Sequence, residues 1–322
     1  MMESQPKPTR DGFGEELVKL GYENERIIVL SADLEDSTRA EYFKFKFPER
    51  FYNTGIAEQN MVGIAAGLAK EGFITFATSF AVFLTNRAYD FIRISICYNN
   101  LNVKLCASHA GVTVGEDGAT AQSLEDIAIM SVLPNLRVVC PIDFIEAKKI
   151  TRFISNEYGP FYIRLSRAPY PILTSENDEF EFGKGRIFRN GEDLTIISYG
   201  ITVSESLKAA EELQKEGISA RVINMSTIKP FDEELVLKSA EETGAILVVE
   251  EHQVINGFGS MIARFLSSKR PTLMEFIGVN GVFGFSGKTY ELLEYFGLDY
   301  KNITRVAKEL VKRKKTNMSS RI

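Results

Sequence analysis

Glu58 is the residue whose type and surroundings most directly suggest chemistry. It stands near the start of residues 52–72 (YNTGIAEQNMVGIAAGLAKEG), a stretch of small and apolar residues that predicts a helix packed closely on all sides. One explanation is structural, because the helix dipole stabilises a carboxylate in the first turn. The other is chemical. A carboxyl group enclosed by such residues is poorly solvated, which favours its protonated form and suits proton exchange with a ring nitrogen.

Two later stretches offer partners for a ligand at such a site. Phe80 and Phe83, in TSFAVFLTNRAYDFIR, have an ordinary role in a core, but beside a buried carboxylate they can form a face for a flat heteroaromatic ring. Residues 108–123 (SHAGVTVGEDGATAQS) interleave glycines with His109 and Asp117 in a loop that follows a strand. Glycine allows the backbone to approach a ligand closely, so this loop is a candidate binding element.

Strand-like apolar runs alternate with helical patterns along the chain, and this alternation predicts the elements that position these residues. In the first half the predicted strands are 26–33, 74–80, 103–109, 136–143 and 161–167, and the predicted helices are 57–71, 82–96, 123–132 and 143–156. In the second half, strands are predicted at 193–200, 219–226, 245–252 and 272–279, with helices at 202–216, 232–243, 257–267 and 287–296. Such alternation is typical of parallel sheets covered by helices on both faces.

The sequence therefore predicts the α/β class, with two doubly wound, mostly parallel sheets in tandem. The predicted domains are residues 1–168 and 193–322, joined by a linker at 169–192 that is rich in proline, glycine and charge. Ligands bind beyond the carboxyl ends of strands in such sheets, and those ends hold Asp33, Phe80, Ser108–His109, Arg167 and His252. All but the last belong to the first domain, so we expect them to line one rim.

Composition restricts the class of partner and the compartment. The formal net charge of −5 argues against a nucleic-acid surface, and the basic run at 312–315 (KRKK) is expected to be a solvated tail. The N-terminal residues lack the apolar core of a signal peptide, and no apolar run is long enough to span a membrane. Cys97, Cys106 and Cys140 lie in apolar runs without metal-ligand spacing, which predicts buried thiols in a reducing compartment, the cytoplasm.

Several short motifs occur together in an order that resembles the C-terminal half of transketolase. They are GIAEQN, TSFAVF, SH with GEDGAT six residues on, LRVVCPID and YIRLSR, and the match covers nearly the whole chain. The resemblance implies a pyrimidine-binding domain followed by a transketolase C-terminal domain. Because some organisms divide transketolase into two polypeptides, it further implies the smaller subunit of a two-chain enzyme.

The resemblance implies thiamine diphosphate as the cofactor, with roles for the residues already noted. The glutamate that matches Glu58 hydrogen-bonds N1′ of the aminopyrimidine, and the residues that match Phe80 and Phe83 pack against that ring. Asp33 and Ile56 match positions close to the cofactor. The implied reaction is transfer of a two-carbon ketol unit from a ketose phosphate to an aldose phosphate, the transketolase reaction of the pentose phosphate pathway.

The resemblance also implies a substrate site. The positions that bind the sugar phosphate are matched by Arg10, Ser37, His109 and Arg167. Asp117 matches a residue that contacts a substrate hydroxyl. Arginine suits phosphate binding because its planar guanidinium can hold the anion with two parallel hydrogen bonds.

Two positions depart from the fused members of the family. Ala121 stands where a substrate-contacting histidine is usual, which affects the hydrogen bonding expected at the reacting carbons. Asn86 stands where a tyrosine often lies beside the cofactor ring. His252 matches the C-terminal domain, which does not bind the cofactor in this family, so we expect it to be structural or at an interface.

One family motif does not occur in the sequence. It is the Gly-Asp-Gly motif, followed at a distance by Asn, which holds Mg²⁺ and the diphosphate in thiamine-diphosphate enzymes. The resemblance therefore implies that a subunit corresponding to the N-terminal half of transketolase supplies those ligands, and that this chain holds half of each active site. It also implies a docking surface that favours self-association, and a heterotetrameric enzyme. Nucleic acid and membranes are not expected partners.

Three other functions stay open at this point. A β subunit of a 2-oxo acid dehydrogenase E1 component has similar length, similar domains and an equivalent glutamate, although the 108–123 loop and Arg167 favour a sugar phosphate. One half of a 1-deoxyxylulose-5-phosphate synthase shares much of the pattern, but that enzyme is a single fused chain. A non-catalytic α/β assembly protein would leave Glu58 and Phe80 without a role.

Overall fold

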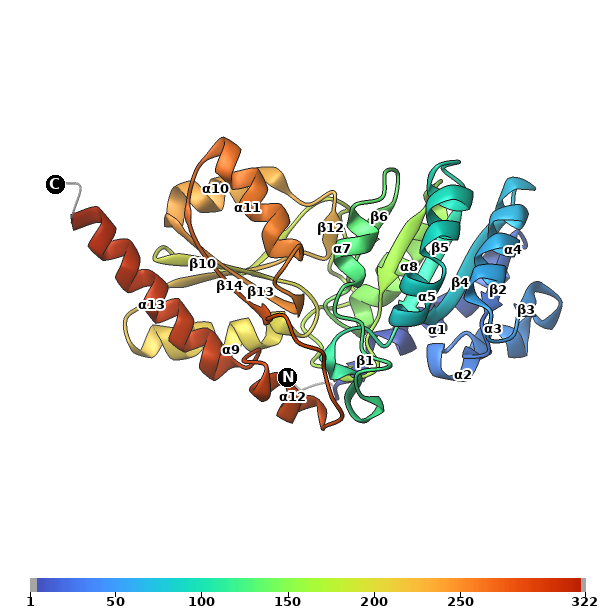
Figure 1. Cartoon of the computed structure of the whole chain (residues 1–322), viewed down its shortest axis with the longest axis horizontal. Coiled ribbons are helices and arrows are strands. Elements are labelled where there is room, and N and C mark those ends of the chain that lie inside the picture. Colours follow the sequence, from blue (N-terminus) through green and yellow to red (C-terminus); the bar gives the residue numbers. More distant parts are fainter. Residues whose placement is uncertain (1–4, 320–322) are drawn as a thin grey trace.

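Two sheets, one in each domain, lie side by side along the long axis of the chain in Figure 1. The computed structural model describes residues 5–319, so the predicted domain limits at residues 1 and 322 lie outside the described residues. Within that range the strands form a seven-stranded sheet, a five-stranded sheet and a two-stranded ribbon. The predicted fold class, with two doubly wound and mostly parallel sheets in tandem, is confirmed.

The first sheet has the strand order β12-β6-β7-β5-β4-β2-β3 and is parallel except at β12, which pairs antiparallel with β6. Its strands are β2 (Ile27–Ser31), β3 (Phe51–Asn53), β4 (Ile74–Phe80), β5 (Val103–Ser108), β6 (Arg137–Val139), β7 (Phe161–Arg164) and β12 (Thr227–Lys229). Side chains alternate between the two faces, so Ile27 and Val29 join one core while Ile28 and Leu30 join the other.

Helices cover both faces of the first sheet. The core that contains Ile27 is covered by α1 (Thr9–Glu23), α3 (Glu41–Lys46) and α8 (Phe144–Asn156), and the core that contains Ile28 is covered by α4 (Glu58–Lys70), α5 (Ala81–Arg87) and α7 (Asp126–Ser131). The short helices α2 (Glu35–Thr38) and α6 (Tyr89–Phe91) lie between these elements in the chain. The amino end of α4 therefore meets the rim where the strands end, and this places Glu58 there.

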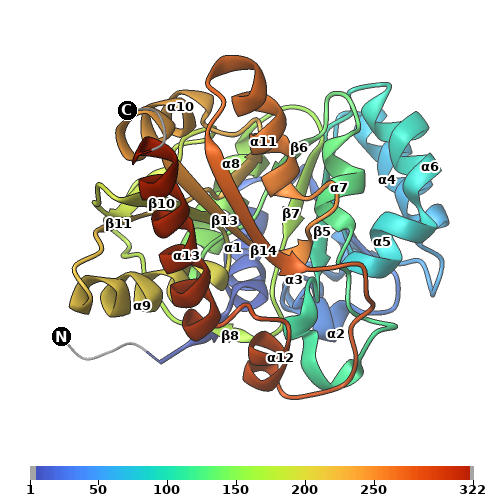
Figure 2. The same ribbon diagram turned by 60° about the vertical axis from the view of Figure 1, so that its left-hand side comes forward.

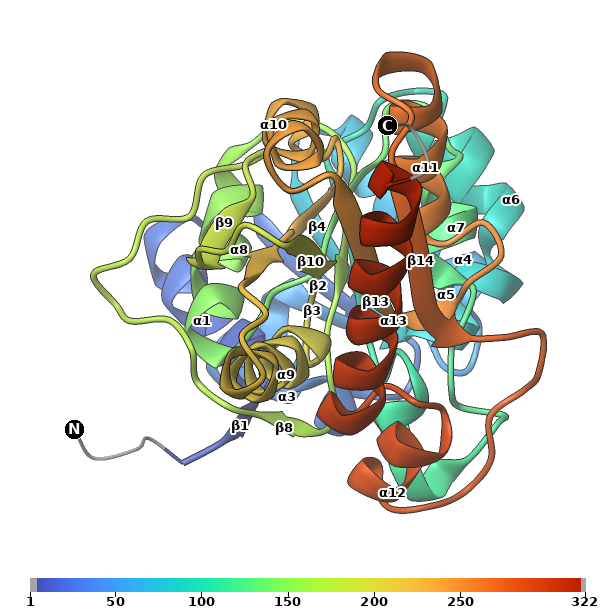
Figure 3. The same ribbon diagram turned by 90° about the vertical axis from the view of Figure 1, so that its left-hand side faces the viewer.

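The second sheet has the order β14-β13-β10-β11-β9 and is parallel except at β9. Its strands are β9 (Arg186–Arg189), β10 (Leu194–Ser198), β11 (Ala220–Asn224), β13 (Ala245–Gln253) and β14 (Leu273–Val279). In Figure 1, α9 (Thr202–Lys215) and α13 (Tyr300–Ser319) lie below this sheet, while α10 (Glu233–Thr243) and α11 (Phe258–Lys269) lie above it. Helix α13 packs along α9 and is seen over its whole length in Figure 3.

The two domains share one apolar core and a covering helix. The cluster under α4, α5 and α7 continues into the second domain through Ile197, Met225 and Phe258. Helix α12 (Thr289–Tyr295) of the second domain packs beside the 3₁₀ segment η3 (Val112–Asp117) of the first, as Figure 2 shows. The glycine-rich loop at 108–123 is therefore held from both domains.

Helix α1 was not predicted from the sequence. It contains Gly12, Gly14 and Gly21, and glycine lowers helix propensity and interrupts the apolar pattern. A Cβ atom added at Gly12 would lie 2.3 Å from the Phe144 carbonyl oxygen, so close packing of α1 on α8 requires the glycine. The glycines that lower the helix propensity of α1, and so prevented its prediction, are also the residues that allow it to pack closely on α8.

The basic run at 312–315 lies in α13, so the prediction of a tail was wrong, but Lys312, Arg313 and Lys315 are exposed to solvent as predicted. Lys314 Nζ donates hydrogen bonds to the backbone carbonyls of Asp193 at 2.9 Å and Thr243 at 2.7 Å. The apolar residues of α13, including Leu310 and Val311, are buried against the second sheet. Long basic side chains can cover apolar surface while their charged ends reach polar partners.

Two other segments differ from the expected pattern. The predicted linker contains β8 (Pro169–Tyr170), which pairs with β1 (Lys7–Pro8), and also β9, which is an edge strand of the second sheet. The predicted helix at 82–96 is divided into α5, α6 and a π-helical segment at Ile92–Cys97. A π-helical turn accommodates an extra residue within a helix, which a 3.6-residue pattern does not reveal.

Buried polar side chains connect the domains. Glu146 of α8 accepts a hydrogen bond from Ser226 Oγ at 2.6 Å, and burial raises the pKa of this carboxyl to about 7. His252 of β13 has no exposed surface, and its Nε2 lies 3.4 Å from the backbone nitrogen of Ala128. His252 thus lies at the junction between domains, in the structural position expected for it.

The cysteines are buried and free, as predicted. Burial raises the pKa of Cys97 and of Cys140 to about 12, so both thiols stay protonated near neutral pH. No helix within residues 5–319 is both long and apolar enough to cross a membrane.

Candidate functional site

Glu58 begins α4 and is almost fully buried, with 1% of its surface exposed. Ser79 Oγ donates to Glu58 Oε1 at 3.4 Å, and Arg87 Nη1 lies 3.4 Å from Oε2. A buried carboxylate requires polar partners because transfer of the charge out of water is costly. The carboxyl group therefore faces the rim with one hydroxyl and one guanidinium beside it.

Phe80 lies at the centre of an aromatic stack, and Arg87 connects the Phe83 end of this stack to the carboxyl group. Its ring stacks on Phe83 with centroids 5.6 Å apart and on His109 with centroids 3.7 Å apart. Ala121 of the glycine-rich loop packs in the same small apolar cluster as Phe80. The structure thus brings three of the predicted residues together and places the departure at Ala121 directly against them.

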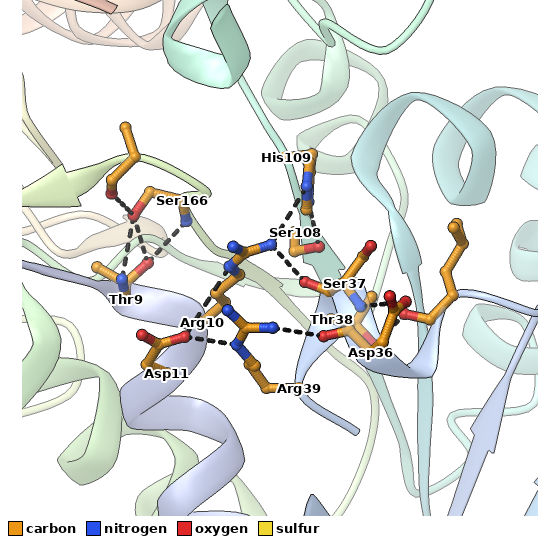
Figure 4. Close-up of polar contacts among 12 residues, drawn as sticks. Thr9, Arg10, Asp11, Asp36, Ser37, Thr38, Arg39, Ser108, His109 and Ser166 are labelled. Carbon is orange, nitrogen blue, oxygen red and sulfur yellow. Dashed lines mark hydrogen bonds and ion pairs between the residues drawn. The ribbon is translucent and has the colours of Figure 1, made fainter. Parts of the chain in front are cut away.

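A group of cationic side chains lies beside His109, as Figure 4 shows. Arg10 Nη1 donates to the backbone carbonyl of Ser37 at 2.7 Å and contacts His109 Nε2 at 3.4 Å. Arg39 donates from Nε to Asp11 Oδ1 at 2.8 Å. Burial, followed by the nearby charge of Arg39, lowers the pKa of Arg10.

Arg10 retains unused hydrogen-bonding capacity. Its Nε is buried, and no atom of the described residues accepts a hydrogen bond from it. Its ion pair with Asp11 is long, at 3.9 Å. A buried donor without an acceptor is unfavourable, so Arg10 is a candidate partner for an anionic ligand.

Arg167 follows β7 and reaches the glycine-rich loop. Its Nη1 donates to the Val114 carbonyl at 2.6 Å, and its Nη2 lies 3.9 Å from Asp117 Oδ1. One third of the side chain, 34%, stays exposed at the rim. The expectation of a shared rim therefore holds for Phe80, His109 and Arg167, with Arg10 contributed by α1.

His109 is neutral in the folded chain. Burial, with additional repulsion from Arg10, Arg167 and Arg39, lowers its pKa to about 2. Because Arg10 can only donate, Nε2 of the ring must accept, and Nδ1 then carries the proton and donates to Ser108 Oγ at 2.8 Å. The ring therefore offers hydrogen bonds and a stacking face without adding charge to the arginines.

The buried neutral state of His109 makes stability depend on pH. In the unfolded chain this histidine becomes protonated as the pH falls through about 6.5. In the folded chain it stays neutral until the pH falls to about 2. The contribution of His109 to stability is therefore present above pH 6.5 and lost as the pH falls. The free energy of unfolding should fall more steeply in the native chain than in His109→Gln, with a difference in slope approaching about 1.4 kcal/mol per pH unit.

Urea unfolding at pH 8.0, 6.5, 5.5 and 5.0, at a fixed chain concentration, measures this difference in slope. The comparison uses slopes because the substitution itself can change the stability at every pH. Parallel curves for the native chain and His109→Gln between pH 6.5 and 5.0 would show that the folded chain protonates His109 normally.

Several predicted residues lie outside this cluster. Asp33 is exposed and accepts a hydrogen bond from Asn53 Nδ2 at 2.9 Å. The side chain of Ile56 is 76% exposed. Asn86, expected beside a ligand ring, instead donates from Nδ2 to Glu125 Oε1 at 2.9 Å. The structure therefore does not bring these three residues into the cluster of Phe80, His109 and the arginines.

Sequence reasoning missed Ser79, Arg87 and Arg39. Arg87 is four residues beyond Phe83 in the same helix, and this spacing places two side chains on one face. Its guanidinium carbon lies 4.3 Å from the centre of the Phe83 ring. The four-residue spacing from Phe83 could have predicted the position of Arg87. No sequence pattern could have predicted that of Arg39, because its contact with Asp11 depends on a turn with φ +65° at Arg39 itself.

Two tandem α/β domains with a buried carboxyl group, an aromatic stack and arginines at one rim match the C-terminal half of a transketolase. Residues 5–172 match the transketolase pyrimidine-binding domain, and residues 183–303 match the transketolase C-terminal domain. The chain belongs to the transketolase family, as the sequence motifs predicted.

Similar proteins include both separate and fused forms. A Methanocaldococcus jannaschii protein named for a transketolase C-terminal section is 47% identical over 311 residues, which are 95% of this chain and 97% of that protein. The 6-deoxy-6-sulfo-D-fructose transketolase subunit SqwH of a Clostridium species is 42% identical, with 95% of each chain covered. Human transketolase is 39% identical over 94% of this chain, which spans 49% of the human protein.

A solved structure also resembles this chain over nearly its whole length. It is described as a split gene transketolase, an inactive beta4 tetramer, and it is 45% identical to this chain. The match covers 95% of this chain and 99% of that one, with a TM-score of 0.89. The described fold is therefore that of a separately encoded transketolase polypeptide.

Proposed function

We propose that this chain is the small subunit of a two-chain, thiamine-diphosphate-dependent transketolase that transfers a two-carbon ketol unit between sugar phosphates. The observation that carries the proposal is the buried carboxyl group of Glu58 next to the Phe80–Phe83 stack, at the rim of a transketolase pyrimidine-binding domain. Relatives that are transketolases at 39–47% identity favour this reaction over that of a 2-oxo acid dehydrogenase subunit. A role as a non-catalytic assembly protein would not explain why Glu58, Phe80 and Phe83 lie together at the rim.

The residues at the rim fit the aminopyrimidine of thiamine diphosphate. A buried carboxyl group suits a ring nitrogen that exchanges a proton, and the aromatic stack suits a flat heterocycle. When bound, thiamine diphosphate supplies the carbon chemistry of ketol transfer. Glu58 would hold and exchange a proton at N1′ of the ring, while Phe80 and Phe83 would orient the ring and exclude water from it. Asp33 and Ile56 would border the cofactor at the solvent edge.

The cationic pocket suits the anionic end of the substrate. Arg10 and Arg167 would bind the terminal phosphate, and Ser37 would add a neutral hydrogen bond. His109 would donate to the phosphate from Nε2 once the phosphate binds Arg10 and the ring adopts its other tautomer. Asp117 would accept from a substrate hydroxyl. A sulfonate is also a tetrahedral oxyanion, and one relative is named for a 6-sulfo sugar. A sulfosugar donor is therefore a second candidate substrate for the same pocket.

The proposal includes a partner that carries the ligands for Mg²⁺ and the diphosphate, corresponding to the N-terminal half of transketolase. The support is the lack of the Gly-Asp-Gly motif in this sequence and the described inactivity of a tetramer of similar chains. Apolar side chains around α4 and α6 are exposed and suit self-association, namely Ile56, Ile64, Phe91, Ile94 and Tyr98. A heterotetramer, a cytoplasmic location and a place in the pentose phosphate pathway stay predictions.

We expect the isolated chain to show no ketol transfer and no tight binding of thiamine diphosphate with Mg²⁺. Calorimetry with cofactor and Mg²⁺ measures this directly, first on the chain and then on the chain mixed with a candidate partner that carries the Gly-Asp-Gly motif. Binding and activity should both appear only in the mixture. A dissociation constant below about 1 µM for the isolated chain, equivalent to roughly −8 kcal/mol, would contradict the two-chain proposal.

A further inference from the structure

Arg87 lies between the two groups that the proposed function assigns to the aminopyrimidine. Its Nη1 is 3.4 Å from Glu58 Oε2, and its guanidinium carbon is 4.3 Å from the centre of the Phe83 ring. The guanidinium thus contacts the carboxyl group and the aromatic face at the same time. A planar cation on an aromatic ring and beside a carboxylate is a favourable arrangement for both neighbours.

The carboxyl group of Glu58 needs such a partner. It is 1% exposed, and its other recorded hydrogen bond, from Ser79, is long at 3.4 Å. A buried carboxylate without a cation or several hydrogen bonds is strongly destabilising. Arg87 therefore offsets part of the cost of keeping an acid buried at the rim.

The position of Arg87 also allows its side chain to move away from Glu58 and Phe83. It is the last residue of α5, and 47% of its side chain is exposed. The fully buried pair of Arg164 and Asp126 provides a contrast, because its atoms are 2.8 Å apart and its side chains are at most 3% exposed. Arg87 can swing into solvent without breaking a packed core, whereas Arg164 cannot.

We propose that Arg87 is a displaceable placeholder, which occupies the contacts of Glu58 and Phe83 until a flat nitrogen heterocycle takes both of them. The ring and the guanidinium compete for the same carboxyl group and the same aromatic face. The identity of the heterocycle rests on the proposed function, and the competition itself rests on the geometry. Arg87 is a positioning residue in this scheme, since it prepares Glu58 for the ligand and then withdraws.

The contact is tested first in the isolated chain, without any cofactor. Arg87→Met should lower the melting temperature by about 2–4 °C in the native background, and by clearly less when Glu58 is already Gln. Arg26→Met is the matched control. Arg26 comes just before β2, at the other end of the strands, and is exposed. Its side chain makes no hydrogen bond or ion pair within residues 5–319, so this substitution should change nothing. Equal shifts in both backgrounds would show that Arg87 does not serve Glu58, and would overturn the proposal.

The competition is tested in the enzyme reconstituted with its partner, by calorimetric titration of thiamine diphosphate. Arg87→Met should tighten cofactor binding about tenfold, or about 1.4 kcal/mol, because the ring no longer displaces a guanidinium. The variant would then be less stable before binding and tighter in binding. Arg26→Met should again match the native enzyme.

The other outcomes are distinct. Weaker binding in Arg87→Met would make the arginine a ligand contact, and unchanged binding would make it a purely structural partner of Glu58; either result overturns the placeholder. If the native reconstituted enzyme binds no thiamine diphosphate, the proposed function fails and the placeholder has no ligand to exchange with. A positive result in the melting experiment would then still establish the pairing of Glu58 and Arg87.

Discussion

Glu58→Gln is expected to lower the turnover of the reconstituted enzyme by roughly 10²–10⁴-fold, the usual effect of removing a proton-transfer group. The amide has the same size as the carboxyl group and can still accept the Ser79 hydrogen bond, so the pocket should keep its shape. It cannot exchange a proton with a ring nitrogen. Turnover at saturating cofactor and substrate, measured for both enzymes, gives the size of the loss.

Glu71→Gln is the matched control for this substitution. Glu71 lies just beyond the other end of the same helix and is exposed, so its amide should leave turnover and melting temperature unchanged. The melting temperature of Glu58→Gln should change by no more than the few degrees assigned to its contact with Arg87 if the loss is chemical. Near-normal turnover of Glu58→Gln at saturating cofactor would return Glu58 to an ordinary role at the start of a helix.

Arg167→Ala is expected to lower kcat/KM for a phosphorylated donor by one to two orders of magnitude. A charge-assisted hydrogen bond contributes about 1.5–3 kcal/mol, and each factor of ten corresponds to about 1.4 kcal/mol. Xylulose 5-phosphate or fructose 6-phosphate should show the full loss. Hydroxypyruvate, which carries no phosphate, should show little. The measurement is kcat/KM for both kinds of donor with the same enzyme preparation.

A structural role for Arg167 makes a different prediction. The side chain also donates to the Val114 carbonyl, so its removal could loosen the glycine-rich loop and affect every donor. Equal losses for phosphorylated and unphosphorylated donors, together with a lower melting temperature, would reject phosphate binding. Arg167→Lys provides a graded comparison, because it keeps the charge but not the planar pair of donors. Its kcat/KM for a phosphorylated donor should lie between the values of the native enzyme and of Arg167→Ala.

The pattern of buried strands was predictable because its cause is local. Strands covered on both faces are apolar throughout, and this pattern identified β2, β4, β5 and β10 close to their observed bounds. The strand β12 was not predicted, since its three residues acquire their role by pairing with β6, which lies about 90 residues earlier. Short segments whose structure depends on distant partners carry no periodic signal.

The contrast between local patterns and contacts with distant residues also applies to the site. The ends of parallel strands meet at one rim, so the closeness of Phe80, His109 and Arg167 followed from the order of elements alone. The pairing of Glu58 with Arg87 did not, because it depends on which way a half-exposed side chain turns. The neutral state of His109 was equally hidden, since it results first from burial and then from nearby arginines, and both arise only in the folded chain.

The pairing of β12 with β6 has a consequence for how the chain is made. During synthesis the first domain emerges from the ribosome complete in all its own strands, yet the edge of β6 stays open until residues 227–229 follow. An open strand edge is a place where chains associate wrongly, and large proteins generally fold domain by domain as they emerge. Until then the growing polypeptide presents an unprotected edge, and we expect the chain to be most prone to wrong association during this interval of synthesis. For the same reason, a gene division or a truncation within the predicted linker would leave the first domain with that edge permanently exposed.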